Sequence, residues 1–305
     1  MAASAPSITA SSPAPAKADA VVRTRRKRRR FDFGLWLPVL WVTLVTVGAL
    51  SAPWLKHVPL IRLQSFKKTS RPVAQLPTMK HWLGTDELGR DIFSRLVWGG
   101  RVALAVGVVS VAVAMVVGGA LGLVAGFYRG KVELVLNTLV GALLAFPALV
   151  LVLAITAFLG HNLGNITFAI AVVAIPAFAR VAYANTLSVS QREYVMAARS
   201  LGAKNARIIR KEVLPNVVLP LSAFALVVTA VAIVAEGGLA FLGLSLDKPT
   251  PTWGSMINDG RKKLTGEGIW HVSFIPIACM FVTVLALNII GDKLRQRIDP
   301  RDAKV

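Results

Sequence analysis

The chain has 305 residues, of which 55% are hydrophobic and only 16% are charged, and its formal net charge is +20. Charged residues make up about 25% of an ordinary soluble domain, so this composition excludes a typical soluble protein. One cysteine excludes a disulfide framework, and the four histidines lack the spacing of metal ligands. No phosphate-binding loop or nucleophile elbow is present, so we expect no catalytic residue and no metal site.

The first segment combines a low-complexity tail with a block of positive charge. Met1–Ala20 is rich in Ala, Ser and Pro, which predicts disorder. Arg23–Arg30 then carries seven basic residues in eight, directly before an apolar run. Basic side chains beside an anionic leaflet gain about 1 kcal/mol each, so this block favours a topology anchor. A nucleic-acid role is the alternative, but no aromatic residues interleave the block.

Six apolar runs contain no Lys, Arg, Asp or Glu. A helix needs about 20 apolar residues to cross about 30 Å of hydrocarbon, and open sheet edges cannot be satisfied in lipid. The expected fold class is therefore an all-α polytopic membrane protein with six transmembrane helices. A cleaved signal peptide is the alternative for the first run, which is longer than a signal core of 7–15 residues. The runs are Gly34–Leu55, Val102–Tyr128, Leu134–Gly160, Leu163–Ala179, Val217–Ala235 and Ile269–Gly291.

Lys and Arg also predict the orientation of these spans. If the N-terminus lies in the cytoplasm, the cytoplasmic segments hold most of the 35 Lys and Arg residues, so both termini are expected in the cytoplasm. Helical spacing of apolar residues over Asp91–Val102 predicts a surface helix that precedes the second span. The expected organisation is a basic cytoplasmic tail (1–33), a first span (34–55), an extracytoplasmic segment (56–100), a five-helix core (101–292) with a polar loop (190–216), and a C-terminal tail (293–305).

Glycine and proline mark packing and bending within the predicted core. Gly118, Gly122 and Gly126 stand four residues apart, so they share one face of the second span. Small residues at this spacing let helix backbones approach closely, either within the chain or at a subunit interface. Pro147 and Pro176 lie within spans and predict kinks.

The polar loop is the most informative segment, because it is charged, structured and set between two spans. Ser190 with Glu193 forms a capping-box pattern that opens a helix. Tyr194, Ala198 and Leu201 would share one face of that helix. A glycine at 202 suits a left-handed helix end. A second helical run spans 205–214 and is expected to end at the following proline. By physics alone, an ordinary cytoplasmic loop with two surface helices explains the segment equally well.

The residue pattern of this loop resembles the EAA loop of bacterial ABC importer permeases. That pattern is Glu-Ala-Ala, three residues, Gly, nine residues, Ile, one residue and Leu-Pro. Here Met196-Ala197-Ala198, Gly202 and Leu214-Pro215 fall in the matching places. Two residues depart from it: Met196 replaces the Glu, and Glu212 replaces the Ile. The peptide branch is similar to this chain at Tyr194-Val195, Ala197-Ala198-Arg199, Leu201-Gly202-Ala203 and Leu214-Pro215-Asn216.

Other motifs extend the resemblance from about residue 80 to 302. Leu83–Asp91 resembles the outer signature of the second permease of dipeptide, oligopeptide and nickel importers. Phe241–Leu244 with Pro249–Gly254 is similar to its last outer loop, and Gly291-Asp292 with Asp299–Arg301 to its C-terminal ending. One departure lies in the third span, where relatives often carry an Arg and a following Asp and this chain has Thr138 and Gly141.

The resemblance implies a type I ABC importer permease in the bacterial inner membrane. Its expected partners are a second, homologous permease, one or two ABC ATPase subunits, an extracytoplasmic solute-binding protein and lipid, with no nucleic acid. ATP and Mg would bind the ATPases, and this chain would bind no cofactor. The residues implied in ATPase coupling are Glu193, Tyr194, Ala197, Ala198, Arg199, Gly202, Ala203, Leu214 and Pro215.

The sequence leaves two questions with several alternatives: the identity of the cargo and the roles of the outer polar residues. The branch imports dipeptides, oligopeptides, nickel chelates and other small solutes, and an ion-coupled secondary transporter is the rival class. Rivals of that class need ionisable residues at mid-membrane, which the six runs lack. Asp86, Arg90 and Asp91 would form either a turn held by ion pairs or a docking patch. Glu236 would contact a peptide amine or a gate partner, bond to a neighbouring subunit, or cap a solvated helix end.

Overall fold

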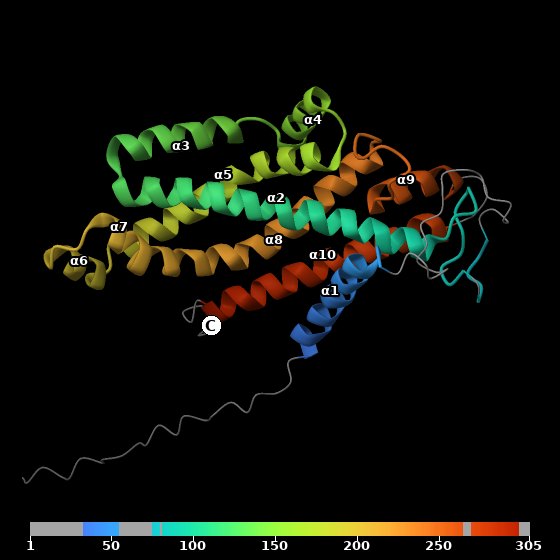
Figure 1. Cartoon of the computed structure of the whole chain (residues 1–305), viewed down its shortest axis with the longest axis horizontal. Coiled ribbons are helices and arrows are strands. Elements are labelled where there is room, and N and C mark those ends of the chain that lie inside the picture. The colour runs from blue at the N-terminus through green and yellow to red at the C-terminus, as the bar shows by residue number, and fades with distance from the viewer. Residues whose placement is uncertain (1–32, 55–74, 80, 265–269, 299–305) are drawn as a thin grey trace, which may run out of the picture. The chain divides into compact units, whose positions relative to one another are not determined.

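The structure is a computed structural model that describes residues 33–54, 75–79, 81–264 and 270–298. Nearly all of the predicted basic tail (1–33), much of the predicted outer segment (56–100) and the chain after residue 298 lie outside these ranges. Within them every regular element is helical (Figure 1). The elements are α1 (Phe33–Ser51), α2 (Ile92–Tyr128), α3 (Gly130–Leu144), α4 (Ala148–Leu159), α5 (Leu163–Ser190), α6 (Glu193–Ser200), α7 (Asn205–Ile208), the π-helical turn η2 (Ile209–Val213), α8 (Leu214–Phe241), α9 (Trp253–Leu264) and α10 (His271–Ile298).

Five helical stretches of the described chain are long and apolar enough to cross a membrane. They comprise α1, α2, α5, α10 and the stretch from α7 to the end of α8. The predicted third span is instead a bent pair, α3 and α4, whose axes differ by 85°. Pro147 lies at this break, where it lacks an amide hydrogen and disfavours helical backbone in the preceding residue. The all-α prediction is confirmed, with the sixth span present only as a broken one.

The helix α2 differs from its prediction, because the expected surface helix and the second span form one helix of 37 residues. At 1.5 Å per residue it is about 55 Å long. Its N-terminus is capped by Asp91, whose carboxylate accepts a hydrogen bond from the backbone nitrogen of Ser94 at 2.9 Å. Gly99 and Gly100 lie within it, and their lack of a side chain leaves room for Trp253 of α9 to pack beside both.

Two buried clusters form the interior of the bundle. The first lies among α2, α5 and α8 and includes Phe127, Phe178 and Leu221. The second joins the start of α2 to α8, α9 and α10 around Trp253, whose indole nitrogen donates to the Leu96 carbonyl at 2.9 Å. The two clusters place α6 and α7 at one end of the bundle and α9 at the other (Figure 1).

The glycine stripe of α2 lies against α5. A Cβ atom at Gly118, Gly122 or Gly126 would overlap the backbone of α5, near Ile175, Ala179 and Tyr183 respectively. The two helix backbones therefore run closer together than any larger residue allows. In this chain the stripe serves packing within one subunit.

We expect Gly122→Ala to lower the stability of the protein by about 1–3 kcal/mol, because the added methyl overpacks the α2–α5 contact. Its Cβ would lie 2.7 Å from both the Ala182 Cβ and the Tyr183 backbone nitrogen. Thermal unfolding of the detergent-purified protein measures the change. Gly141→Ala in α3 is the matched control, because nothing lies within 4 Å of its Cβ position. Equal unfolding midpoints for the two variants would contradict this packing.

Candidate functional site: the α6–α7 end of the bundle

The segment between α5 and α8 folds back on the end of the bundle and anchors there by three apolar side chains. Val195, Ile208 and Val213 are fully buried and belong to the first core cluster. The segment comprises α6, α7 and the π turn η2, which leads directly into α8. Because each of its short elements contributes a buried residue, the segment is held as part of the bundle.

The turn between α6 and α7 is a Schellman motif around a left-handed glycine. Gly202 has a φ of +76°. Its amide donates to the Arg199 carbonyl at 2.9 Å, and the Ala203 amide donates to the Ala198 carbonyl at 3.0 Å. These bonds satisfy carbonyls that a helix end leaves free. The left-handed end expected at this glycine is confirmed.

The predicted start of α6 is wrong by two residues. Ser190 is the last residue of α5, and its buried hydroxyl has no hydrogen-bond partner among the described residues. The N-cap is Arg192, which makes no side-chain capping bond, and Glu193 is the first helical residue. The helix α5 runs on to Ser190, so the capping box cannot form. Glu193 still lies at the helix start, where a negative charge is favourable.

The residue of α6 that packs most deeply against the bundle, Val195, lies outside the face predicted to hold Tyr194, Ala198 and Leu201. Val195 is buried and Ala198 is half-buried, so these residues face the bundle. Tyr194 and Leu201 are instead exposed, and Leu201 is 88% accessible. The contact made by the neighbouring helices decides which side of so short a helix is covered. Of the residues implied in coupling, Ala198 and Ala203 are half-buried and the exposed ones are Glu193, Tyr194, Ala197, Arg199, Gly202, Leu214 and Pro215.

The helix does not end at Pro215 as predicted. Pro215 lies in the first turn of α8, where a missing amide hydrogen is tolerated. The preceding residue, Leu214, donates its amide to the Ile209 carbonyl, five residues back. Such a π turn inserts one extra residue into a helix and is frequent at functional sites. The consequence is a continuous helical path from α7 into the long α8.

One contact of the segment gave no signal in the sequence. The Arg199 guanidinium lies 5.1 Å from the centroid of the Phe127 ring, one residue from the end of α2. Cations over aromatic faces attract by about 0.5–1 kcal/mol at exposed sites. This contact joins α6 to α2, although 72 residues separate the two side chains in the chain.

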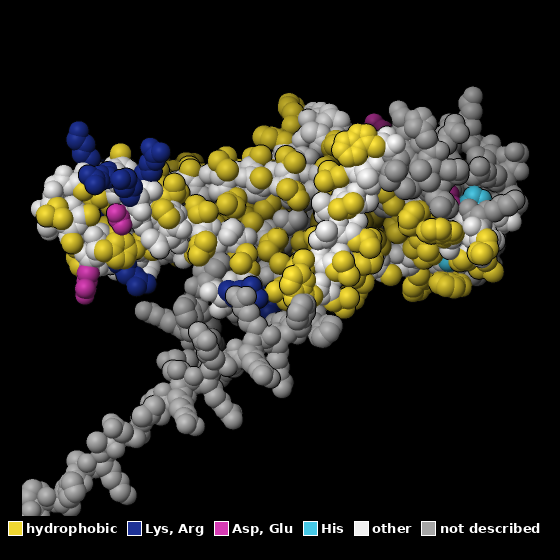
Figure 2. Space-filling model, turned by 60° about the horizontal axis from the view of Figure 1, so that its bottom comes forward, with side chains coloured by type: hydrophobic (Ala, Val, Ile, Leu, Met, Phe, Trp, Pro, Cys, Tyr) yellow, Lys and Arg dark blue, Asp and Glu magenta, His cyan; other side chains and the backbone are white. Residues whose placement is uncertain are grey.

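Positive charge collects on this end of the molecule. The segment carries the acids Glu193 and Glu212 against a larger set of exposed cations. Among the described residues, none of these cations forms an ion pair within 4 Å. Figure 2 shows the dark-blue side chains at the end that α6 and α7 occupy. The exposed cations are Arg192, Arg199, Lys204, Arg207, Arg210 and Lys211.

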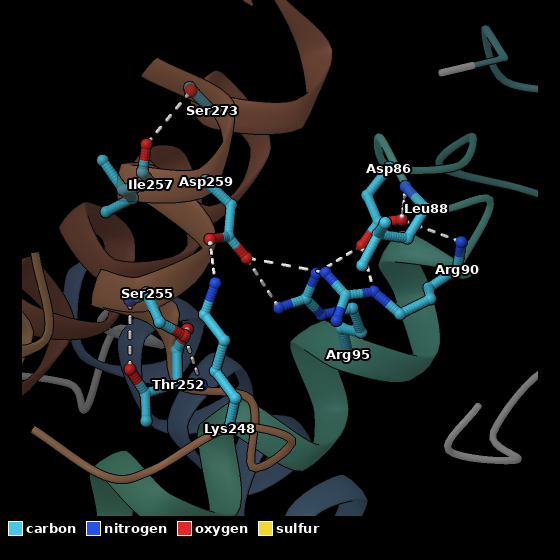
Figure 3. Close-up of polar contacts among 10 residues, drawn as sticks. All are labelled: Asp86, Leu88, Arg90, Arg95, Lys248, Thr252, Ser255, Ile257, Asp259 and Ser273. Atoms are coloured by element: carbon cyan, nitrogen blue, oxygen red, sulfur yellow. Dashed lines mark hydrogen bonds and ion pairs between the residues drawn. The ribbon is translucent and has the colours of Figure 1, made fainter. Parts of the chain in front are cut away.

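At the opposite end, Asp86 organises a buried ion-pair network (Figure 3). Its Oδ2 atom accepts from Arg90 Nε at 2.6 Å and from Arg95 Nη1. Asp259 of α9 lies 3.5 Å from Arg90 Nη2 and 3.3 Å from Arg95 Nη2, and Lys248 Nζ lies 3.3 Å from its Oδ1. Burial first, and the neighbouring Arg95 charge second, lower the pKa of Arg90 below its ordinary value.

The outer residues chosen from the sequence are thus turned inward. Asp86, Arg90 and Asp91 are all buried, and Asp91 also accepts from His81, whose Nδ1 lies 2.7 Å from Asp91 Oδ2. This geometry matches a turn held by ion pairs and leaves little carboxylate surface for docking. Asp259, the acid that ties α9 to this turn, was absent from the sequence-based set, because nothing in the sequence places it beside Arg90.

Glu236 lies within α8 and not at a solvated helix end. It is 1% exposed, and Ser245 in the loop after α8 donates to its Oε1 at 3.0 Å. Its Oε2 atom has no hydrogen-bond partner among the described residues. The sequence-based alternative of a solvated end is therefore wrong, because the α8–α9 loop covers the carboxylate. In the same described ranges, no three His, Cys, Asp or Glu residues are placed to hold a metal ion.

This architecture has relatives among known proteins. A family model described as the inner membrane component of binding-protein-dependent transport systems matches residues 118–303, more than half of the chain. The chain belongs to this family. It is a permease subunit of an ABC importer and an inner-membrane protein. That assignment sets aside the ion-coupled secondary transporter.

Individual relatives agree with the family. The permease is 40% identical over 225 residues to the glutathione transport system permease protein GsiD of Pectobacterium atrosepticum, with 74% of each chain covered. It is 40% identical over 245 residues to the dipeptide transport system permease protein DppC of Alkalihalophilus pseudofirmus, with 80% of each chain covered. Among solved structures, a chain of the inward-facing MetNI methionine ABC transporter matches with a TM-score of 0.55 and 20% identity. That match covers 67% of the permease and 96% of the other chain, and it supports the fold.

Proposed function

We propose that this permease translocates di- or oligopeptides delivered by a solute-binding protein, with ATP hydrolysis on separate ATPase subunits. The proposed cargo rests on the similarity of this chain to two permeases that are named for dipeptide and glutathione transport. Both cargoes are peptides, which favours peptides over nickel chelates. A second, unlike permease completes the pathway, and ATP with Mg binds the ATPases and not this chain.

The α6–α7 end is the proposed docking site for the ATPase, on the cytoplasmic side. Three observations support it: the segment matches the coupling loop of the family in sequence, it is exposed, and it is fastened to the bundle at Val195 and Ile208. A segment anchored in this way moves with α2, α5 and α8, and so passes a displacement of the ATPases to the spans. A flexible linker would dissipate that displacement.

Uptake by the reconstituted transporter tests the cargo. Permeases, ATPases and the binding protein are placed in liposomes, and labelled dipeptide, tripeptide and nickel are offered with and without ATP. We expect peptide uptake that requires ATP. Uptake of nickel alone, or uptake driven by a proton gradient without ATP, would overturn the proposal.

Site-directed crosslinking tests the docking site. The chain has one cysteine, the buried Cys279, so an introduced cysteine dominates the reaction. We expect Ala197→Cys, at an exposed site of α6, to crosslink to the ATPase. Thr250→Cys, exposed at the opposite end, is the matched control and should capture none. Capture by the control alone would place the ATPase at the end opposite α6 and α7 and would contradict the proposed docking site.

A further inference from the structure

The helix α5 carries an exposed arginine within its apolar span. Arg180 lies ten residues before the end of this helix at Ser190 and directly follows Ala179, which packs against Gly122 of α2. The helix α2 continues six residues beyond Gly122, or about 9 Å, so Arg180 lies inside the apolar layer and nearer the end that α6 and α7 occupy. A charged side chain at membrane depth is costly and almost always faces the bundle interior or a water-filled cavity.

The described residues supply no counter-charge for this arginine. Within the part of the chain that the structure describes, Arg180 forms no ion pair within 4 Å. The acid of the neighbouring helix α3, Glu133, instead accepts a hydrogen bond from the Tyr183 hydroxyl. The Arg180 guanidinium is therefore available to an anionic group that comes from outside the chain.

The Tyr183–Glu133 hydrogen bond also fixes the level of α3 against α5. The helix α3 leaves the α6–α7 end of the bundle and α5 returns to it (Figure 1). Asn137 follows Glu133 by four residues and Arg180 precedes Tyr183 by three, so each lies about one helical turn farther from that end. Asn137 is exposed as well. An arginine and an asparagine thus lie at the same level on adjoining helices.

The break between α3 and α4 indicates what this side of the bundle faces. Ala145, Phe146 and Pro147, at the 85° bend, are all exposed. Irregular backbone at membrane depth is tolerated only where protein buries it or where it lines a water-filled cavity. This requirement favours a water-filled pathway, and not lipid, beside α3.

We infer that Arg180 and Asn137 form a binding site in the translocation pathway for the carboxylate end of the transported peptide. A guanidinium binds a carboxylate through two parallel hydrogen bonds. The side-chain amide of Asn137 both donates and accepts, as the adjoining peptide group requires. The inference rests on the proposed peptide cargo and adds the chemical group that the pathway recognises.

The phosphate of an anionic lipid is the rival ligand of Arg180. It offers oxygens to the same guanidinium fork, and a long arginine side chain reaches toward the membrane interface. The exposed Asn137 at the same level disfavours lipid, because an amide that meets hydrocarbon has no hydrogen-bond partner there.

Uptake by the reconstituted transporter with its binding protein tests the inference. A labelled dipeptide and its C-terminal amide are offered, and the ratio of their uptake rates is measured. The preference of the binding protein is common to every permease variant, so a change in this ratio arises in the permease. We expect Arg180→Gln to lower the ratio of free to amidated peptide by about tenfold, as loss of a hydrogen bond to a charged group does.

Two further variants frame this result. Arg180→Lys keeps the charge but loses the fork, so its ratio should lie between those of the wild type and Arg180→Gln. Arg101→Gln is the matched control, because Arg101 is an exposed arginine over the Trp98 ring near the start of α2. It should keep the wild-type ratio.

A cysteine probe tests the water-filled face without changing the arginine. Ala184 is exposed and lies one turn from Arg180 on the same side of α5. We expect Ala184→Cys in the assembled complex to react with a charged thiosulfonate reagent, because the thiolate that reacts forms in water. Leu44→Cys, at an exposed position of α1, is the matched control and should not react.

The outcomes separate the site from the cargo. An unchanged ratio in Arg180→Gln overturns the inference, and so does an unreactive Ala184→Cys. Uptake that falls equally for both peptides, and only in vesicles with phosphatidylglycerol, assigns Arg180 to lipid and also overturns it. Absence of ATP-dependent peptide uptake by the wild type would instead refute the proposed cargo.

Discussion

Gly202→Val is expected to reduce ATP-dependent uptake by about tenfold or more while the permease still reaches the membrane. The φ of +76° is strained for every residue with a side chain, and the strain costs roughly 1–2 kcal/mol, with β-branched residues the worst. Nothing lies within 4 Å of the Cβ position, so the effect arises from the backbone alone. Relief of the strain would unwind the Schellman turn and displace Leu201. Uptake, ATP hydrolysis and membrane abundance are measured together.

Gly202→Asn is the matched control for this prediction. Asparagine tolerates the left-handed conformation better than other non-glycine residues, so this variant should keep most of the uptake. Uncoupling should show as ATP hydrolysis that continues without transport. Normal uptake in Gly202→Val would contradict the rigid turn. Loss of the protein from the membrane would show that the turn serves folding instead of coupling.

Asp86→Asn should lower the free energy of unfolding by about 3–5 kcal/mol, the usual cost of removing one partner from a buried ion pair. The reason is the pair of buried guanidinium groups, Arg90 and Arg95, that share the Asp86 carboxylate. Asp259 contacts both arginines, but at 3.5 Å and 3.3 Å, so it compensates only in part. Thermal unfolding of the purified protein should show a clearly lower midpoint.

Lys248→Gln provides the comparison within the same network. The Lys248 side chain is 61% exposed, and exposed ion pairs contribute about 0–1 kcal/mol. Its loss should leave the unfolding midpoint almost unchanged. The double variant Asp86→Asn with Arg95→Gln should recover part of the stability, since it also removes one uncompensated charge. A shift from Lys248→Gln as large as that from Asp86→Asn would show that burial does not set the energetics here.

Much of the fold was predictable because the bilayer imposes its requirements locally. A run without charged residues is driven into a helix wherever it meets hydrocarbon, so four of the spans and most of the stretch through α8 were expected from the sequence. Pro147 signalled a break for a local reason as well. The size of the break was not predictable, because an 85° bend depends on what packs around it.

Some features of the candidate site were likewise predictable from the local sequence, and others were not. The turn at Gly202 follows from a property of glycine itself, so the sequence predicted it. The inward face of α6, the π turn before Pro215 and the Arg199–Phe127 contact depend on residues that are distant in the chain. The same holds for Asp86 and Glu236, whose carboxylates are buried by groups from α9 and the α8–α9 loop.

The sequence by itself determined a polytopic helical protein with a structured, cationic loop of the ABC importer permease type, because hydrophobic length, backbone propensity and motif spacing are carried by neighbouring residues. Only the tertiary structure decided which side of that loop is exposed and which outer charges are buried. Those properties depend on the distances between α2, α5, α8 and α9, and such distances are set when the helices pack together.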